Sequence, residues 1–292
     1  MSILALDIGG TAIKSGLLEE DGSILLSAEH PSDAHKGGPF LMERIYEIIG
    51  LYSGYTKIGI STAGQVDAEN GIIVFANQNI PDYTGMHVRD LVAQRFHVPV
   101  FVENDVNCAA LGEAYYGAGK EYTDFLCLTY GTGIGGAIII NRRLYKGFKG
   151  IAAEFGHIIT HASGLPCGCG LSGCYEQYAS TRALVLEAQK ADKDCGSGRA
   201  IFEKLAGNAA VKAAVDAWID EILIGLASLI HAFNPPCVVL GGGIMNEDYI
   251  LNEIRAKLPR HVMESCRDTV INKASLGNKA SMLGAMKLTL SD

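Results

Sequence analysis

Two stretches of this chain follow the same pattern, in which an apolar strand enters a glycine-rich turn and a second strand leaves it. The first covers residues 3–18 with its turn at Gly9-Gly10-Thr11, and the second covers residues 125–140 with its turn at Gly131-Thr132-Gly133. Such turns expose backbone N–H groups, which suit phosphate oxygens. The internal repeat therefore predicts that one structural unit, able to hold phosphate, occurs twice.

Helical and strand patterns alternate over the first 116 residues, as in an α/β domain. A second set of strands begins at residue 125, and helices dominate after it, the longest at residues 209–233. A strand at residues 237–240 then enters a third glycine-rich turn, Gly241-Gly242-Gly243. The 292 residues suit two domains of about 150 residues each. Because no Pro- or Ser-rich linker separates them, we expect two packed domains with a cleft between them.

Composition limits the partners of the chain. Lysine and arginine total 24 against 32 acidic residues, a net charge of −8, so the chain has no general basic field for nucleic acid. No run approaches the ~18 apolar residues of a membrane span, and the first residues lack the positive start of a signal peptide. We therefore expect a cytoplasmic protein that binds neither nucleic acid nor membranes.

The three glycine-rich turns belong to no common nucleotide motif. None is followed by the Gly-Lys-Ser/Thr of a Walker loop, and none opens a helix as GxGxxG does. One turn alone would more often be an ordinary hairpin, but three turns, two of them with a threonine, favour phosphate binding. An acidic chain of this kind must hold a polyphosphate through backbone amides and a metal ion.

Four potential metal ligands occur within 18 residues. His157, Cys167, Cys169 and Cys174 are spaced H-x9-C-x-C-x4-C, with glycines between the thiols that let the loop fold back. One histidine and three thiolates form a closed tetrahedral set that suits zinc in a structural role. Glu154 and Glu176 flank this set, so the metal loop could orient two carboxylates, unless they are solvated surface acids.

A carboxylate lies at the junction of a predicted strand and a predicted helix. Glu103-Asn104-Asp105 ends the strand and precedes a helix at residues 107–116. Ligands of α/β sheets bind at such strand ends. The alternative is that Asp105 only caps the helix.

Four segments together carry a resemblance to a known family, in the same order along nearly the whole chain. They are Asp7-Ile8-Gly9-Gly10-Thr11, Glu103-Asn104-Asp105-Val106-Asn107, Glu154-Phe155-Gly156-His157, and the cysteine segment through Tyr175-Glu176. These segments resemble the ROK family, bacterial sugar kinases and related repressors within the actin-like ATPase superfamily.

The resemblance implies an α/β fold of two ribonuclease-H-like lobes with ATP in the interlobe cleft. Residues 1–116, completed by a C-terminal helix at 279–292, would form the smaller lobe. Residues 117–278 would form the larger lobe, which carries the zinc loop.

The resemblance also implies residue roles. Asp105 matches the catalytic base, and His157 matches a residue that serves both zinc and sugar. The sugar-binding residues would be Gly64, Asn104, Asp105, Glu154, His157 and Glu176. The residues for ATP and its Mg²⁺ would be Asp7, Gly9, Gly10, Thr11, Lys14, Gly131, Thr132, Gly133, Gly241, Gly242 and Gly243. The chain departs from the family at Ala12, where many members have Lys or Asn, and at Ala153, where Gly often precedes the glutamate.

The leading expectation is an ATP-dependent kinase that phosphorylates glucose or a close relative at O6. The alternatives are N-acetylmannosamine, fructose or a β-glucoside as substrate, and polyphosphate as donor. A sugar-sensing regulator without kinase activity is a further alternative, but the first phosphate turn begins at Asp7 and leaves no room before it for a helix-turn-helix. The family also implies a homodimer.

Overall fold

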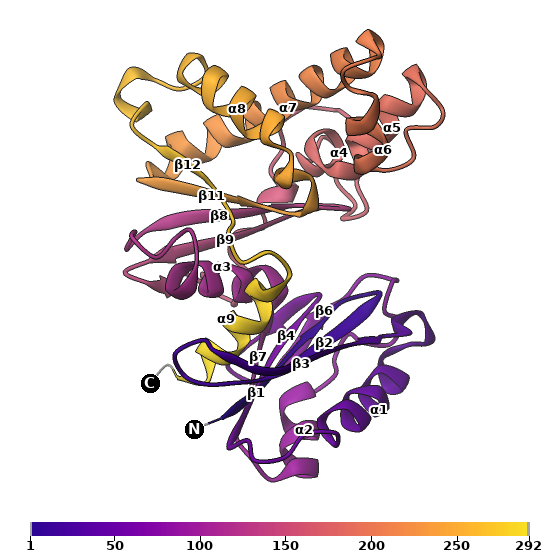
Figure 1. The fold of residues 1–292 in the computed structure, drawn as a ribbon, viewed down its shortest axis with the longest axis vertical. Coiled ribbons are helices and arrows are strands. Elements are labelled where there is room, and N and C mark those ends of the chain that lie inside the picture. Colours follow the sequence, from indigo (N-terminus) through magenta and orange to yellow (C-terminus); the bar gives the residue numbers. More distant parts are fainter. Residues whose placement is uncertain (1, 291–292) are drawn as a thin grey trace. The chain divides into compact units, whose positions relative to one another are not determined.

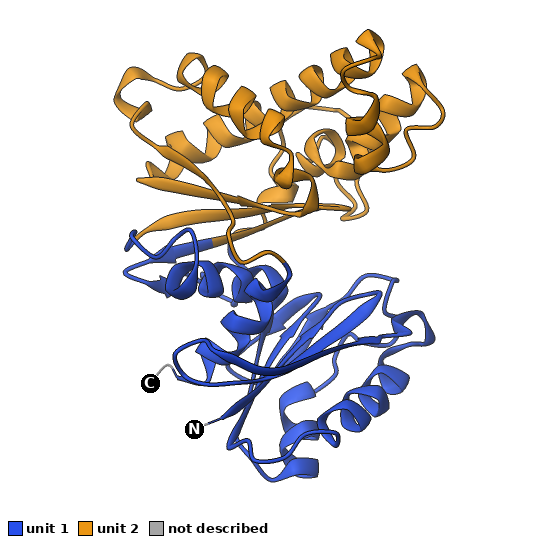
Figure 2. Cartoon of the chain, viewed as in Figure 1, with its two compact units in different colours: residues 1–123, 138–152, 278–292 blue, residues 124–137, 153–277 orange. Residues whose placement is uncertain are grey.

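The computed structural model describes residues 2–290 and divides into two compact units. Unit 1 consists of Met1–Thr123, Ile138–Ala152 and Asn278–Asp292, and unit 2 consists of Asp124–Ala137 and Ala153–Gly277 (Figure 2). Unit 1 thus gathers three separate segments of the chain. The helix expected at residues 279–292 corresponds to α9 (Ala280–Leu288), and residues 291 and 292 lie outside the described part.

The sheet of unit 1 has the strand order β3-β2-β1-β4-β7. Strands β1, β2 and β3 form an antiparallel meander, whereas β1, β4 and β7 run parallel. Their carboxyl ends therefore meet at one edge of the sheet. The strands are β1 (Ile3–Ile8), β2 (Ala12–Leu18), β3 (Ile24–Pro31), β4 (Lys57–Thr62) and β7 (Val100–Asn104). A separate hairpin pairs β5 (Gln65–Asp67) with β6 (Ile72–Phe75).

Both faces of this sheet are covered, which explains why β1 is apolar along nearly its whole length. Leu4, Leu6 and Ile8 join one core with the buried faces of α1 (Gly38–Ile49) and α2 (Val88–Phe96). Helix α9 packs on the opposite face. There Gly59 lets the helix backbone approach, because a Cβ would meet the carbonyl of Ala285. Figure 1 shows α1 and α2 on one side of the sheet and α9 on the other.

Helices α3 (Asp105–Tyr116) and α9 approach closely through small residues. A Cβ at Gly112 would meet the carbonyl of Ala280, and a Cβ at Gly284 would meet the carbonyl of Cys108. Because α3 begins at Asp105, this backbone-to-backbone packing also fixes the helix that carries the candidate base. Ser281 contributes directly, since its hydroxyl donates to the carbonyl of Asp105 at 3.3 Å.

The second sheet has the order β10-β9-β8-β11-β12 and repeats the topology of the first. In both sheets the first strand in sequence is central, with the second strand on one side and the fourth on the other. The predicted duplication is therefore confirmed. The strands are β8 (Phe125–Tyr130), β9 (Ile134–Ile140), β10 (Arg143–Leu144), β11 (Cys237–Gly241) and β12 (Val270–Lys273).

Unit 2 also contains five α-helices. They are α4 (Glu176–Ala179), α5 (Thr181–Ala191), α6 (Gly198–Lys204), α7 (Ala209–Phe233) and α8 (Asp248–Lys257). Helix α7 has the bounds expected from the sequence. Asn208 caps its start, and Asn234 ends it in a left-handed conformation with φ of 43°. No helix within residues 2–290 is long and apolar enough to cross a membrane.

Candidate functional site

Asp7 lies at the carboxyl end of β1, among groups from the two neighbouring strands. Ser61 is its partner in β4, and the Ser61 hydroxyl donates to Asp7 Oδ1 at 2.8 Å. Lys14 is its partner in β2, and Lys14 Nζ lies 3.7 Å from Asp7 Oδ2. Burial raises the pKa of Asp7, and the Ser61 hydrogen bond and the Lys14 charge oppose that shift. The sheet register thus brings a carboxylate, a hydroxyl and an ammonium group together, although Asp7 and Ser61 are 54 positions apart in the sequence.

The glycine-rich turn between β1 and β2 is tight and open to solvent. The N–H of Gly9 donates to the carbonyl of Ala12 at 2.9 Å, and this bond closes the turn. Gly10 and Thr11 at its tip are exposed. A Cβ at Gly10 would have no heavy atom within 4 Å, so no contact within the fold requires glycine at this position. The backbone at this turn is accessible to a ligand.

Asn104, and not Asp105, caps helix α3. The Asn104 side-chain oxygen accepts the N–H groups of Val106 and Asn107 at 2.9 and 3.1 Å. The interpretation of Asp105 as the cap is therefore wrong, because Asp105 is the first residue of the helix. The Asn104 amide nitrogen donates to the carbonyl of Gly64 and to Asp105 Oδ1, both at 2.9 Å. Both amide hydrogens of Asn104 are thereby used.

The carboxyl group of Asp105 has a raised pKa. Burial raises its pKa to about 6, and the negative charge of Asp7 raises it as well. Hydrogen bonds from the Val106 N–H and the Asn104 amide oppose the shift. A carboxylate with such a pKa can accept a proton far more readily than an ordinary aspartate.

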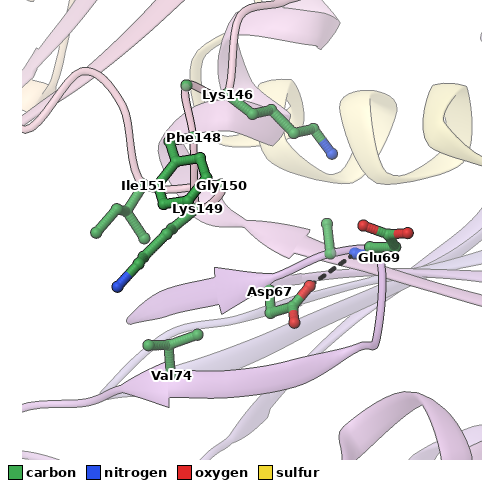
Figure 3. Close-up of a pocket in the computed structure, with 10 residues that line it drawn as sticks. Asp67, Glu69, Val74, Lys146, Phe148, Lys149, Gly150 and Ile151 are labelled. Atoms are coloured by element: carbon green, nitrogen blue, oxygen red, sulfur yellow. Dashed lines mark hydrogen bonds between the residues drawn. The ribbon is translucent and has the colours of Figure 1, made fainter.

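A cavity of about 550 Å³ lies in unit 1 (Figure 3). The β5–β6 hairpin forms one wall, and the loop at residues 146–151 forms the other. Gly64 directly precedes the hairpin and has φ of 102°, a conformation that favours glycine. Figure 3 shows Phe148 and Lys149 on the loop above Asp67 and Val74 of the hairpin. The lining residues are Asp67, Ala68, Glu69, Val74, Lys146, Gly147, Phe148, Lys149, Gly150 and Ile151.

Unit 2 brings two of the three glycine-rich turns together. Strands β8 and β11 are parallel neighbours, so the turns that follow them lie side by side. A pocket of about 440 Å³ opens there, between these turns and the first residues of α5 and α6. Helix N-termini and unpaired turn amides favour anions. The lining residues are Tyr130, Gly131, Thr132, Thr181, Arg182, Val185, Leu186, Ser197, Gly198, Gly243 and Ile244.

Contacts within this pocket explain its glycines. Gly242 has φ of 101°, and a Cβ there would collide with the backbone of Tyr130. Gly131 accepts the N–H of Thr181 at 2.9 Å, which ties the turn to α5. In contrast, a Cβ at Gly131 or Gly243 would meet nothing within 4 Å. Those two glycines therefore leave open space beside the pocket.

The fold of unit 2 also gathers the four potential metal ligands. The ligand atoms of His157, Cys167, Cys169 and Cys174 all lie within 4.8 Å of one another. The two sulfurs of Cys169 and Cys174 are 3.5 Å apart, and Cys167 Sγ is 3.7 Å from His157 Nδ1. A tetrahedral zinc with Zn–S distances of about 2.3 Å separates its ligands by about 3.8 Å. The donor set and its spacing thus fit zinc.

The thiols of this cluster influence one another's pKa values. Burial and the neighbouring thiols of Cys169 and Cys167 raise the pKa of Cys174 to about 12. The N–H of Leu171 lowers the pKa of Cys169. Three thiolates this close repel one another, so a positive ion is the natural partner that would hold all of them ionised.

Two carboxylates border the cluster, as the sequence pattern suggests. Glu176 Oε1 lies 3.9 Å from His157 Nδ1 and accepts from Cys167 Sγ at 3.2 Å. Glu154 Oε2 lies 4.0 Å from His157 Nε2. Glu176 also approaches the turn after β8, because a Cβ at Gly133 would lie 2.5 Å from Glu176 Oε2. The loop with the four potential metal ligands and the glycine-rich turn after β8 therefore meet at Glu176.

Several residues of these sites escaped the sequence analysis. Ser61 belongs to no motif of its own, and only strand pairing places it beside Asp7. Thr181 is the first residue of α5 and Ser197 is the N-cap of α6, and both line the pocket of unit 2. Their position at predicted helix N-termini could have indicated an anion-binding role, since anions bind at such termini.

Comparison with known proteins assigns the chain to a family. Residues 3–292 match the ROK family, and the chain belongs to it. The glucokinase of Streptomyces coelicolor is 37% identical over 98% of this chain and 96% of its own length. A β-glucoside kinase of Listeria monocytogenes is 33% identical over 98% and 96%.

Solved structures confirm the fold. The ROK family glucokinase of Streptomyces griseus, solved in complex with glucose and AMPPNP, superposes with a TM-score of 0.87. It is 34% identical, and the match covers 99% of each chain. The α/β fold of two related halves, expected from the sequence, is therefore confirmed.

Proposed function

We propose that this protein is an ATP-dependent hexose kinase whose preferred substrate is glucose or a close relative. The observation that carries the proposal is Asp105, a carboxylate at a strand–helix junction that is not the N-cap residue of α3 and has a pKa raised to about 6. Membership of the ROK family and similarity to glucokinases along the whole chain support it.

Asp105 would act as the general base toward the attacking hydroxyl, at O6 of the hexose. A hydroxyl is a weak nucleophile, and its proton must leave as the phosphoryl group arrives. The loose transition state of phosphoryl transfer makes orientation as important as proton removal. The hydrogen bond from the Asn104 amide holds Asp105 Oδ1 and leaves Asp105 Oδ2 for the hydroxyl.

The triphosphate would lie on backbone N–H groups of the three glycine-rich turns. The exposed tip at Gly10 and Thr11 and the pocket beside Gly131 and Gly243 support this placement. When bound, Mg²⁺ neutralises phosphate charge, as in other kinases. Asp7 would hold it, because carboxylates are preferred ligands of Mg²⁺. Lys14 beside Asp7 would contribute further positive charge.

The sugar hydroxyls would be bound by Gly64, Asn104 and Asp105 of unit 1 and by Glu154, His157 and Glu176 of unit 2. Asn104 already uses both amide hydrogens within the protein. A hydroxyl that accepts from Asn104 must therefore replace the carbonyl of Gly64 or share the amide with it. This competition would link sugar binding to the start of the β5–β6 hairpin.

The ion that fits His157, Cys167, Cys169 and Cys174 is a structural zinc, since four protein ligands close the coordination sphere. Its contribution would be to fix the loop that carries His157 and Glu176. On the basis of the family resemblance, we also propose that the protein is a homodimer, which sedimentation analysis would test.

The decisive experiment is a coupled assay of the purified protein with ATP and Mg²⁺ against a panel of sugars. The panel contains glucose, mannose, N-acetylmannosamine, N-acetylglucosamine, fructose and an aryl β-glucoside, each with ATP and with polyphosphate. We expect the highest kcat/KM with glucose and ATP. Lack of turnover with every sugar and both donors, in zinc-loaded folded protein, would refute the proposed function.

A further inference from the structure

Glu103 is a fully buried carboxylate that has no role in the scheme above. It is the residue directly before Asn104, near the end of β7. Its Oε1 accepts the backbone N–H of Asn104 at 2.9 Å and the side-chain amide of Asn107 at 3.0 Å. Glu103 therefore holds both the backbone at Asn104 and the first turn of α3, which begins at Asp105.

The other oxygen of Glu103 pairs with a lysine from a distant segment. Lys146 Nζ lies 2.6 Å from Glu103 Oε2, and its side chain is 37% exposed, whereas that of Glu103 is 1% exposed. Lys146 belongs to residues 138–152, which return to unit 1 from the second strand set. Its side chain lines the cavity described above, with its ammonium group turned away from Phe148 and Ile151 (Figure 3).

We propose that Lys146 and Glu103 form a positioning pair for phosphoryl transfer, which holds Asn104 and Asp105 in their working geometry. This inference rests on the proposed function of Asp105 as the base. Neither residue touches the reacting atoms. Lys146 acts on Glu103, Glu103 acts on the backbone of Asn104, and Asn104 acts on Asp105 through its amide.

The charges around the site explain why the pair is needed. Three carboxylates, of Asp7, Glu103 and Asp105, gather at the strand ends of unit 1. Asp7 has Lys14 at 3.7 Å, and Glu103 has Lys146 at 2.6 Å. Within residues 2–290 no lysine or arginine forms an ion pair with Asp105, which is held by an amide and an N–H group.

Loss of Lys146 would leave a buried charge without a partner. Removal of one partner from a buried pair is much more harmful than removal of both, because the remaining charge is uncompensated. Glu103 would then move toward water. This movement would loosen its hold on the Asn104 N–H, and Asp105 follows directly in the chain.

The test compares Lys146→Met with Lys146→Arg in the full-length, zinc-loaded enzyme. Because small misplacements of a reacting group cost up to about 100-fold, we expect Lys146→Met to lower kcat by about 10- to 100-fold. The KM for ATP should stay within about twofold. Lys146→Arg should recover most of the activity, since a guanidinium also pairs with a carboxylate.

Lys149→Met is the matched control. Lys149 lines the same cavity three residues further along and is exposed, and no residue of the described chain forms an ion pair with it. This variant should keep kcat within about twofold, because exposed charges contribute little. Equal kcat for Lys146→Met, Lys149→Met and the unchanged enzyme would overturn the proposal. So would a Lys146→Met enzyme whose only defect is a lower melting temperature.

A double-mutant cycle tests whether the two residues act as a pair. The double variant combines Glu103→Gln with Lys146→Met. The side-chain amide oxygen introduced at position 103 can still accept the Asn104 N–H, and no buried charge remains there. We expect the double variant to lose no more kcat than either single variant. Losses that multiply would show that the two residues act independently and would contradict the pair.

One measurement separates this proposal from the proposed function. Hydrogen exchange at the backbone N–H of Asn104, followed by NMR, reports the Glu103 hydrogen bond without any turnover. We expect faster exchange in Lys146→Met and not in Lys149→Met. If the wild-type protein phosphorylates no sugar, the proposed function is refuted. The pair of Lys146 and Glu103 is rejected by a different result, namely hydrogen exchange at the Asn104 N–H that is equally fast in Lys146→Met and in the wild-type protein.

Discussion

The side-chain amide of Asn104 donates a hydrogen bond to Asp105 Oδ1 at 2.9 Å, while its oxygen caps helix α3. The sequence left open whether Asp105 caps the helix or serves as the base, and the structure assigns the cap to Asn104. Because Asn104 satisfies the helix N-terminus, the Asp105 carboxylate keeps an oxygen for chemistry.

Asp105→Asn should lower kcat by at least ~10²-fold, because an amide cannot accept the hydroxyl proton. Its size and hydrogen bonding stay similar, so sugar affinity and zinc content should be unchanged. Steady-state kinetics and equilibrium sugar binding would measure both effects. A folded variant with near-normal kcat would remove Asp105 from the mechanism.

The activity should depend on the protonation of Asp105. Since its pKa is about 6, kcat/KM for the sugar should fall as the pH drops through about 6, in proportion to the ionised fraction. Activity is measured from pH 5 to pH 8.5, with a check that the protein stays folded throughout. A flat profile between pH 5 and pH 7 would contradict the assigned base.

Asp105 should also affect stability, with a sign opposite to that of a salt-bridged aspartate. Its folded-state pKa of about 6 lies above the ordinary 3.8, so its favourable contribution is complete below pH 3.8 and disappears as the pH rises through 6. Asp105→Asn cannot ionise. It should therefore melt at a higher temperature than the unchanged protein at pH 8, and the difference should shrink toward pH 5. A difference independent of pH would show that ionisation of Asp105 is not its cause.

Gly131→Val should raise the KM for ATP at least ~10-fold, because a side chain beside the pocket blocks the approach of phosphate to the backbone. A Cβ there meets nothing within 4 Å, so the melting temperature should hardly change. Gly207→Val is the control, since Gly207 has the same open space but lies outside the pocket. An equal rise in the KM values for ATP and sugar would argue against a nucleotide site at Gly131.

Removal of the metal should weaken stability and sugar binding together, because the loop that carries the metal ligands also carries Glu176. Protein purified without chelators should hold about one zinc per chain. Cys174→Ser or treatment with a chelator should lower the melting temperature and reduce sugar affinity. Absence of near-stoichiometric zinc in elemental analysis would reject the site.

Sequence alone was sufficient for features that depend on local pattern. Apolar periodicity located the strands on both sides of each glycine-rich turn, and the repeat indicated two related units, now seen as two sheets of one topology. The spacing of His157 and the three cysteines also identified a set that the fold brings within 4.8 Å. These features are encoded within short stretches, where chain connectivity already limits what can meet.

Only the tertiary structure decided which distant residues become neighbours. Strand pairing places Ser61 beside Asp7, and a returning segment places Lys146 against Glu103 from a different part of the chain. The reason for glycine at positions 112 and 284 is visible only in the packing of α3 against α9, where a Cβ would meet the backbone of the other helix. The reason is physical: burial and packing select these contacts from the whole chain at once, and no local pattern records a partner that lies in another element.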